Sequence, residues 1–169
     1  MIGDDLCKKL SFKSLDFWYL ELVAKPVPST GPALVRVHRV GVCGTDLHAF
    51  LGKQPYFSYP RILGYELGVE IIEAPDGEKD LRSGMLCAVE SYLNCRNCNA
   101  CRQGQTNCCK ELRVLGVHTD GGMCEHLEIP VDKVHFFEEL SLDQLAMVEP
   151  LSIGEHAVAR AQLKPEETA

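Results

Sequence analysis

The residues with the clearest capacity for chemistry are four closely spaced cysteines: Cys95, Cys98, Cys101 and Cys109. Four thiolates complete the tetrahedral coordination of a zinc ion, at about 2.3 Å each, and leave no position open for water or substrate. The residues between them are polar or turn-forming, so a metal would have to hold the segment together. The spacing therefore predicts a structural zinc in a lobe of about residues 94–112.

Free or disulfide-bonded thiols and an iron–sulfur cluster are the alternatives to zinc at these four cysteines. Iron–sulfur clusters also use four thiolates, but their usual sequence settings differ from this one. The chain has nine cysteines, an odd number, whereas secreted disulfide frameworks favour an even count. The spacing assigns Cys109 as the fourth ligand, and its neighbour Cys108 is the alternative for that position.

Most of the elements that must position this lobe are predicted strands. Apolar runs bounded by glycine and proline predict strands over residues 33–40, 67–74, 85–90, 125–131 and 133–137. The strands are short and are separated by turn-forming residues, which is typical of a mainly β domain.

The segments between these strands are predicted loops and turns. Glycines bound a loop over residues 41–46, and prolines among aromatic residues predict an irregular packed loop over residues 54–60. Asp-Gly pairs predict turns over residues 75–77 and 120–122. Residues 15–23 have an ambiguous period, which fits one or two strands or a short helix.

A helical segment is predicted toward the C-terminus. Ser141 and Gln144 have the spacing of a capping box, so a helix is expected to begin there. Pro150 is expected to interrupt it, and a second helical stretch is predicted over residues 151–163. Many short strands followed by helices predict a mainly β fold with short helices, barrel-like and with a C-terminal helical segment.

The composition is that of an ordinary folded domain. The 169 residues are 46% apolar and 24% charged, enough for one domain and hardly enough for two. The formal charge of −7 argues against a nucleic-acid partner, which requires clustered basic residues. No apolar run reaches the roughly 18 residues of a membrane helix, and the N-terminus lacks the pattern of a secretory signal. We therefore expect a cytoplasmic protein with no membrane partner.

Four motifs, in the right order, resemble those of one enzyme family. Residues 41–48 read Gly-Val-Cys-Gly-Thr-Asp-Leu-His, and residues 64–70 read Gly-Tyr-Glu-Leu-Gly-Val-Glu. The four-cysteine lobe comes next, and residues 149–152 read Glu-Pro-Leu-Ser. Over about residues 26–164 these segments resemble the zinc-dependent medium-chain alcohol dehydrogenases, and they are most similar to the sorbitol, polyol and threonine dehydrogenase branch.

The resemblance implies a GroES-like, partly open β-barrel that is the catalytic domain of an alcohol or polyol dehydrogenase. In such an enzyme a second, catalytic zinc polarises the oxygen of a small alcohol, which then gives a hydride to NAD or NADP. The resemblance implies Cys43, Glu66 and Glu149 as ligands of that zinc. It implies Thr45 and His48 as the hydroxyl and imidazole that carry the released proton toward solvent.

Each of these residues also has an ordinary structural interpretation. A lone cysteine such as Cys43 is often just a small buried residue. Glu66 can be an acid paired with an arginine, and Glu149 can simply end a helix. Thr45 can be a turn residue and His48 an exposed imidazole. The motif context favours the functional interpretation most strongly for Cys43 and Glu66.

Tyr65 departs from the family pattern, which calls for a histidine ligand at this position. A neutral imidazole is a good zinc donor near pH 7, whereas a phenol must first lose a proton of pKa about 10. We therefore expect the catalytic position to bind zinc weakly, and the substitution Tyr65→His to raise the zinc content from near one to near two per chain.

The nucleotide-binding pattern Gly-x-Gly-x-x-Gly is not found in the sequence. We therefore expect residues 1–169 to form the GroES-like domain without a Rossmann domain, as a monomer that does not transfer hydride by itself. The alternative function is a non-catalytic, zinc-stabilised structural or interaction module descended from such an enzyme. A zinc-ribbon nucleic-acid binder is disfavoured by the acidic net charge.

Overall fold

The structure, a computed structural model, describes residues 5–14, 17–27, 29–78, 80–164 and 167. Its strands are β1 (Leu6–Ser14), β2 (Phe17–Ala24), β3 (Pro32–Gly41), β4 (Arg61–Ile62), β5 (Glu66–Glu73), β6 (Leu86–Val89), β7 (Tyr92–Leu93), β8 (Arg113–Val114), β9 (His126–Pro130) and β10 (Val134–Phe136). Its helices are α1 (Gly44–Phe50), α2 (Asn99–Arg102), α3 (Leu142–Ala146) and α4 (Val148–Ala161), with short 3-10 helices η1 (Thr106–Cys108) and η2 (Val131–Lys133). The mainly β fold with short helices is confirmed, and each of the five predicted strands is present to within one residue at either end.

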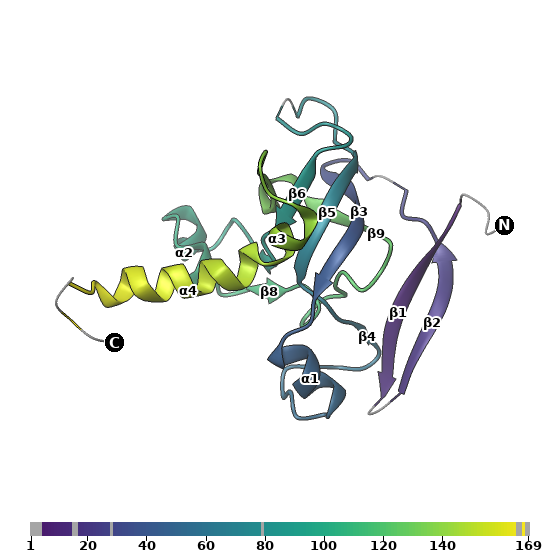
Figure 1. Ribbon diagram of the computed structural model, residues 1–169, viewed down its shortest axis with the longest axis horizontal. Coiled ribbons are helices and arrows are strands. Elements are labelled where there is room, and N and C mark those ends of the chain that lie inside the picture. Colours follow the sequence, from purple (N-terminus) through teal and green to yellow (C-terminus); the bar gives the residue numbers. More distant parts are fainter. Residues whose placement is uncertain (1–4, 15–16, 28, 79, 165–166, 168–169) are drawn as a thin grey trace.

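A curled five-stranded antiparallel sheet of order β10-β6-β5-β3-β9 forms the body of the domain (Figure 1). Leu67, Val69 and Ile71 of β5 are at most 1% exposed and lie at the centre of its core. In the pairing of β3 with β5, Gly41 lies opposite Glu66. Because of this register, the segment that leaves β3 and the segment that enters β5 meet at the same end of the sheet.

The segment with ambiguous periodicity forms the second strand of an N-terminal hairpin. β1 and β2 pair antiparallel, and β4 pairs with the other edge of β1. The hairpin packs on α1 through aromatic side chains, since the ring centroid of Phe50 lies 6.4 Å from that of the buried Phe12 and 5.5 Å from that of Trp18. Of the ambiguous residues 15–23, Leu15 and Asp16 lie outside the described residues.

The predicted loop over residues 41–46 is wrong in its second half, where α1 begins. Cys43 is the N-cap of α1, and its Sγ accepts a hydrogen bond from the Thr45 backbone N–H at 3.2 Å. The Asp46 carboxylate in turn accepts from the Cys43 backbone N–H at 3.0 Å. This reciprocal arrangement satisfies N–H groups that a helix start would otherwise leave unpaired, so a short helix forms despite the nearby glycines.

The predicted turn over residues 120–122 is also wrong. This segment instead runs against residues 62–64: the Gly121 N–H donates to the Ile62 carbonyl at 2.8 Å and the Gly122 N–H to the Gly64 carbonyl at 2.7 Å. The glycine is required for close approach, because a Cβ on Gly121 would lie 2.3 Å from the Gly64 carbonyl oxygen. The hydrogen-bonded turn lies earlier, over residues 116–118.

The predicted helix start at Ser141 is confirmed, since Ser141 caps α3 through a capping box with Gln144. The expected interruption at Pro150 is wrong. Pro150 lies in the first turn of α4, where a missing N–H removes no intrahelical hydrogen bond. In Figure 1 α4 extends away from the sheet, on the side opposite the N-terminal hairpin. Within the described part of the chain, no helix is long and apolar enough to cross a membrane.

Candidate functional site

The four cysteines of the lobe converge on one point. The Sγ atoms of Cys95, Cys98, Cys101 and Cys109 all lie within 4.8 Å of one another. The Sγ of Cys101 lies 4.0 Å from that of Cys95 and 3.5 Å from that of Cys98. A tetrahedral zinc with bonds of about 2.3 Å requires sulfurs about 3.8 Å apart. All four are free thiols, so the residues fit a four-thiolate zinc site.

Backbone N–H groups of the lobe point at these sulfurs. The Cys98 N–H donates to Cys95 Sγ at 3.3 Å, and the Cys95 N–H donates to Cys109 Sγ at 3.3 Å. Backbone hydrogen bonds from Cys101 and Lys110 lower the pKa of the Cys98 thiol to about 6. Such bonds favour the thiolate, which is the form that binds a metal. The neighbouring Cys108 is exposed and lies outside the cluster.

A second cluster lies where β3 ends and β5 begins. The Tyr65 hydroxyl lies 2.9 Å from Cys43 Sγ, and it donates a hydrogen bond to Thr45 Oγ1 at 3.1 Å. Burial, followed by the contact with Cys43, raises the pKa of Tyr65 well above its ordinary value. The phenol therefore stays neutral at physiological pH and joins the thiol to the threonine hydroxyl.

Two buried carboxylates lie beside this cluster. Glu66 and Glu149 are each 8% exposed. The Glu66 carboxylate packs on Gly41, where an added Cβ would lie 2.1 Å from Oε2. Burial, together with the negative charges of Glu149 and Asp46, raises the pKa of Glu66. The Tyr92 hydroxyl donates to Glu149 Oε1 at 2.8 Å and so fixes that carboxylate.

His48 lies on α1, one turn after Thr45, and its side chain is exposed to solvent. Residues three apart share a helix face, so the imidazole is on the same side of α1 as the threonine. This placement suits a proton exit to water.

The sequence-predicted ligands of a catalytic zinc do not fit that ion in this structure. The lobe cysteines offer four donor atoms within 4.8 Å of one another. Among the described residues, no such set is formed by Cys43, Glu66 and Glu149. The nearest polar neighbour of the Cys43 sulfur is the neutral Tyr65 hydroxyl. The structure therefore brings Cys43 and Thr45 together at Tyr65, but it does not bring the predicted ligands into a metal-binding arrangement.

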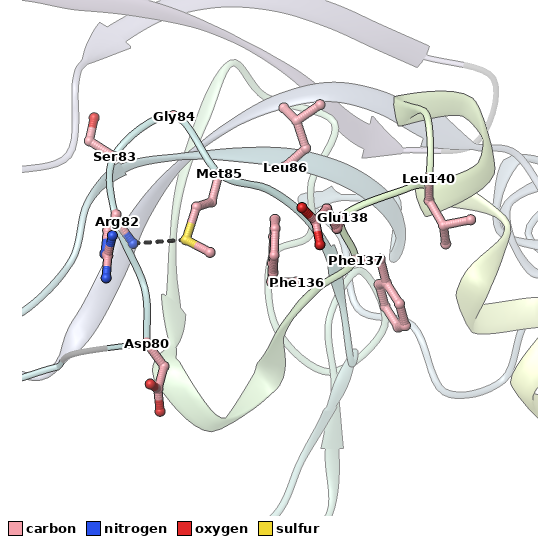
Figure 2. Close-up of a pocket in the computed structure, with 10 residues that line it drawn as sticks. All are labelled: Asp80, Arg82, Ser83, Gly84, Met85, Leu86, Phe136, Phe137, Glu138 and Leu140. Atoms are coloured by element: carbon pink, nitrogen blue, oxygen red, sulfur yellow. Dashed lines mark hydrogen bonds between the residues drawn. The ribbon is translucent and has the colours of Figure 1, made fainter.

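A pocket of about 610 Å³ touches this region from the side of α4. Its walls include Tyr92 and Glu149, together with Thr106 of the lobe and His156 of α4. Figure 2 shows another pocket, of about 690 Å³, lined by residues such as Arg82, Met85 and Phe136. None of the candidate site residues lines the pocket in Figure 2, so the first pocket is the relevant one.

Sequence reasoning missed two members of the site. Asp46 stands three residues after Cys43, and this capping-box spacing was the available signal. Tyr92 contacts Glu149 across 57 residues of chain, and no local pattern marks such a pair.

Residues 29–139, about two thirds of the chain, match the family model of the alcohol dehydrogenase GroES-like domain. The chain belongs to this family. This GroES-like domain is 44% identical over 142 residues to L-galactonate-5-dehydrogenase of Escherichia coli K12, an alignment that covers 84% of the chain and 42% of the relative. It is 31% identical over 156 residues to sorbitol dehydrogenase of Bacillus subtilis, covering 88% of the chain and 44% of the relative.

Solved structures agree with this placement. The GroES-like domain superposes on the alcohol dehydrogenase RspB of E. coli CFT073, complexed with NADH, with a TM-score of 0.88 at 29% identity. The superposition covers 97% of this chain and 48% of RspB. The resemblance inferred from the motifs and the GroES-like fold are thus confirmed. The chain spans less than half the length of these curated relatives.

Proposed function

We propose that this chain is the GroES-like domain of an NAD(P)-dependent alcohol or polyol dehydrogenase, stabilised by one structural zinc in its four-cysteine lobe. The observation that carries the proposal is the convergence of four free thiols within 4.8 Å in a member of this family. When bound there, zinc would cross-link the lobe and, with all four positions filled, would take no part in chemistry.

The residues of the second cluster are suited to hold a small alcohol or polyol. Thr45 and Tyr65 offer hydroxyl groups that donate and accept hydrogen bonds, and Tyr92 anchors a carboxylate that accepts them. Thr45 and the exposed His48 would pass a proton between the substrate hydroxyl and water. These roles need no metal at Cys43.

Hydride transfer also needs a nicotinamide cofactor, whose pyrophosphate binds a glycine turn at a helix N-terminus. Residues 1–169 lack the glycine pattern of such a turn. We therefore propose that this chain by itself neither binds NAD or NADP nor transfers hydride, and that it acts as a monomeric part of the reaction site.

A non-catalytic, zinc-stabilised structural or interaction module is the second candidate. Tyr65 favours it, because a neutral phenol stands where the family pattern calls for a metal-binding imidazole. A polyol substrate series offered to the chain together with a nicotinamide-binding domain would separate the two candidates: turnover supports the enzyme, and its absence supports the module.

The assignment of the zinc is tested by the matched variants Cys109→Ser and Cys108→Ser, with zinc measured by elemental analysis. We expect wild type and Cys108→Ser to carry about one zinc per chain and Cys109→Ser to carry almost none. Calorimetric titration with NAD and NADP should show no binding to the wild-type chain. Equal zinc in both variants would contradict the four-cysteine assignment.

A further inference from the structure

The Tyr65 hydroxyl stands beside the thiol that the family pattern assigns to a catalytic zinc. It lies 2.9 Å from Cys43 Sγ, whereas a thiolate ligand holds its zinc at about 2.3 Å. The same hydroxyl donates to Thr45 Oγ1 at 3.1 Å. A metal approaching Cys43 from this side would therefore have to break both contacts and displace the aromatic side chain.

The Cys43 sulfur is also oriented by the start of α1. It accepts the Thr45 backbone N–H at 3.2 Å as the N-cap of α1, and Asp46 completes the capping box. This geometry fixes the thiol in one orientation, directed at Tyr65. The thiol thus has its hydrogen-bonding partners within the protein.

The acidic residues do not replace the missing imidazole. Glu149 is fixed by its hydrogen bond from Tyr92. Among the described residues, its carboxylate oxygens do not form a set with Cys43 Sγ and the Glu66 carboxylate in which all donor atoms lie within 4.8 Å of one another. A zinc ion taken up here would gain one thiolate but no carboxylates that converge on the same point, short of the three protein ligands of ordinary catalytic sites.

We infer that Tyr65 closes the catalytic-zinc position of this domain, so that the chain binds zinc in its four-cysteine lobe alone and the Cys43–Tyr65–Thr45 cluster works as a metal-free hydrogen-bonding site. The inference rests on the proposed function for the zinc of the lobe. It differs from that proposal in assigning a specific blocking role to one hydroxyl-bearing side chain.

The experiment measures zinc per chain by elemental analysis after dialysis against zinc, in wild type, Cys43→Ser, Tyr65→His and Tyr65→Phe. Tyr65→Phe is the matched control, because it removes the hydroxyl, keeps the ring and adds no ligand. We expect about one zinc in wild type, Cys43→Ser and Tyr65→Phe, and about two in Tyr65→His. The double variant Tyr65→His/Cys43→Ser should return to about one, which locates the gained ion.

Two results would overturn the inference. The first is a wild-type chain with about two zinc ions of which Cys43→Ser loses one, because the site would then bind zinc despite Tyr65. The second is Tyr65→His that folds, by circular dichroism, and gains none. If wild type carried no zinc while Tyr65→His gained one ion, the assignment of the lobe would fail but the blocking role of Tyr65 would stand. Should Tyr65→His not fold, the comparison of wild type with Cys43→Ser decides alone.

Discussion

Replacing Gly121 by alanine tests the contact that supports the entry to β5. An added Cβ would lie 2.3 Å from the Gly64 carbonyl oxygen, 2.6 Å from Gly116 Cα and 2.7 Å from the Leu63 carbonyl oxygen. All three are backbone atoms, so no flexible side chain can move aside. The segment that carries Tyr65 must therefore shift by about 1 Å to restore ordinary contact distances.

The expected cost follows from these contacts. Overpacking of a tight interior costs about 1–3 kcal/mol. The shift also weakens the hydrogen bonds from Gly121 N to Ile62 O and from Gly122 N to Gly64 O, at about 1 kcal/mol each. We therefore expect Gly121→Ala to lower the free energy of unfolding by about 3–5 kcal/mol, a large part of the stability of a domain of this size.

Urea unfolding followed by far-ultraviolet circular dichroism measures this change, with zinc present in every sample. Gly154→Ala is the matched control, since Gly154 is exposed inside α4 and an added Cβ meets nothing within 4 Å. Alanine favours helix over glycine by up to about 1 kcal/mol, so this variant should be as stable as wild type or more so. A Gly121→Ala midpoint equal to that of Gly154→Ala would refute the reasoning.

Two further predictions concern the ion pair of Glu90, the residue that follows β6, and the cap of α3. Hydrogen bonds with His135 and then Lys133 lower the pKa of Glu90. The stability that Glu90 contributes is therefore complete above its unfolded pKa of about 4.3, and it is lost as the pH falls through the lower pKa of the folded state. Glu90→Gln should thus lower the unfolding free energy by about 1 kcal/mol near neutral pH and by much less at acidic pH. Equal losses in urea titrations at the two pH values would contradict this. Ser141→Ala removes the hydroxyl that accepts the Gln144 N–H at 3.4 Å, and it should lower the unfolding free energy by about 1 kcal/mol in the same assay. The control Ser141→Thr should lower it less, and equal losses of stability in the two variants would argue against the cap.

The features that could be predicted from sequence are those whose physical cause is local. The five strands follow from runs of apolar residues between breakers, and the start of α3 follows from Ser141 and Gln144, which bond each other within one turn. The lobe cysteines are close in sequence, so their spacing alone predicted that their sulfurs would meet.

The features that were missed depend on contacts between distant segments. Gly121 resembles a turn residue next to Asp120, but its role is to let one backbone approach another 57 residues earlier. Tyr92 becomes part of the site only because α4 brings Glu149 to it. The start of α1 has a local signal in the spacing of Cys43 and Asp46, but cysteine is an uncommon cap, so this signal does not stand out in the sequence.

The zinc content of the purified wild-type chain tests the central claim most directly. Elemental analysis should give about one zinc per chain, which Cys109→Ser removes and Cys43→Ser leaves in place. A wild-type chain without zinc, or one whose zinc depends on Cys43 rather than on Cys109, would contradict the claim that the metal of this domain lies in its four-cysteine lobe.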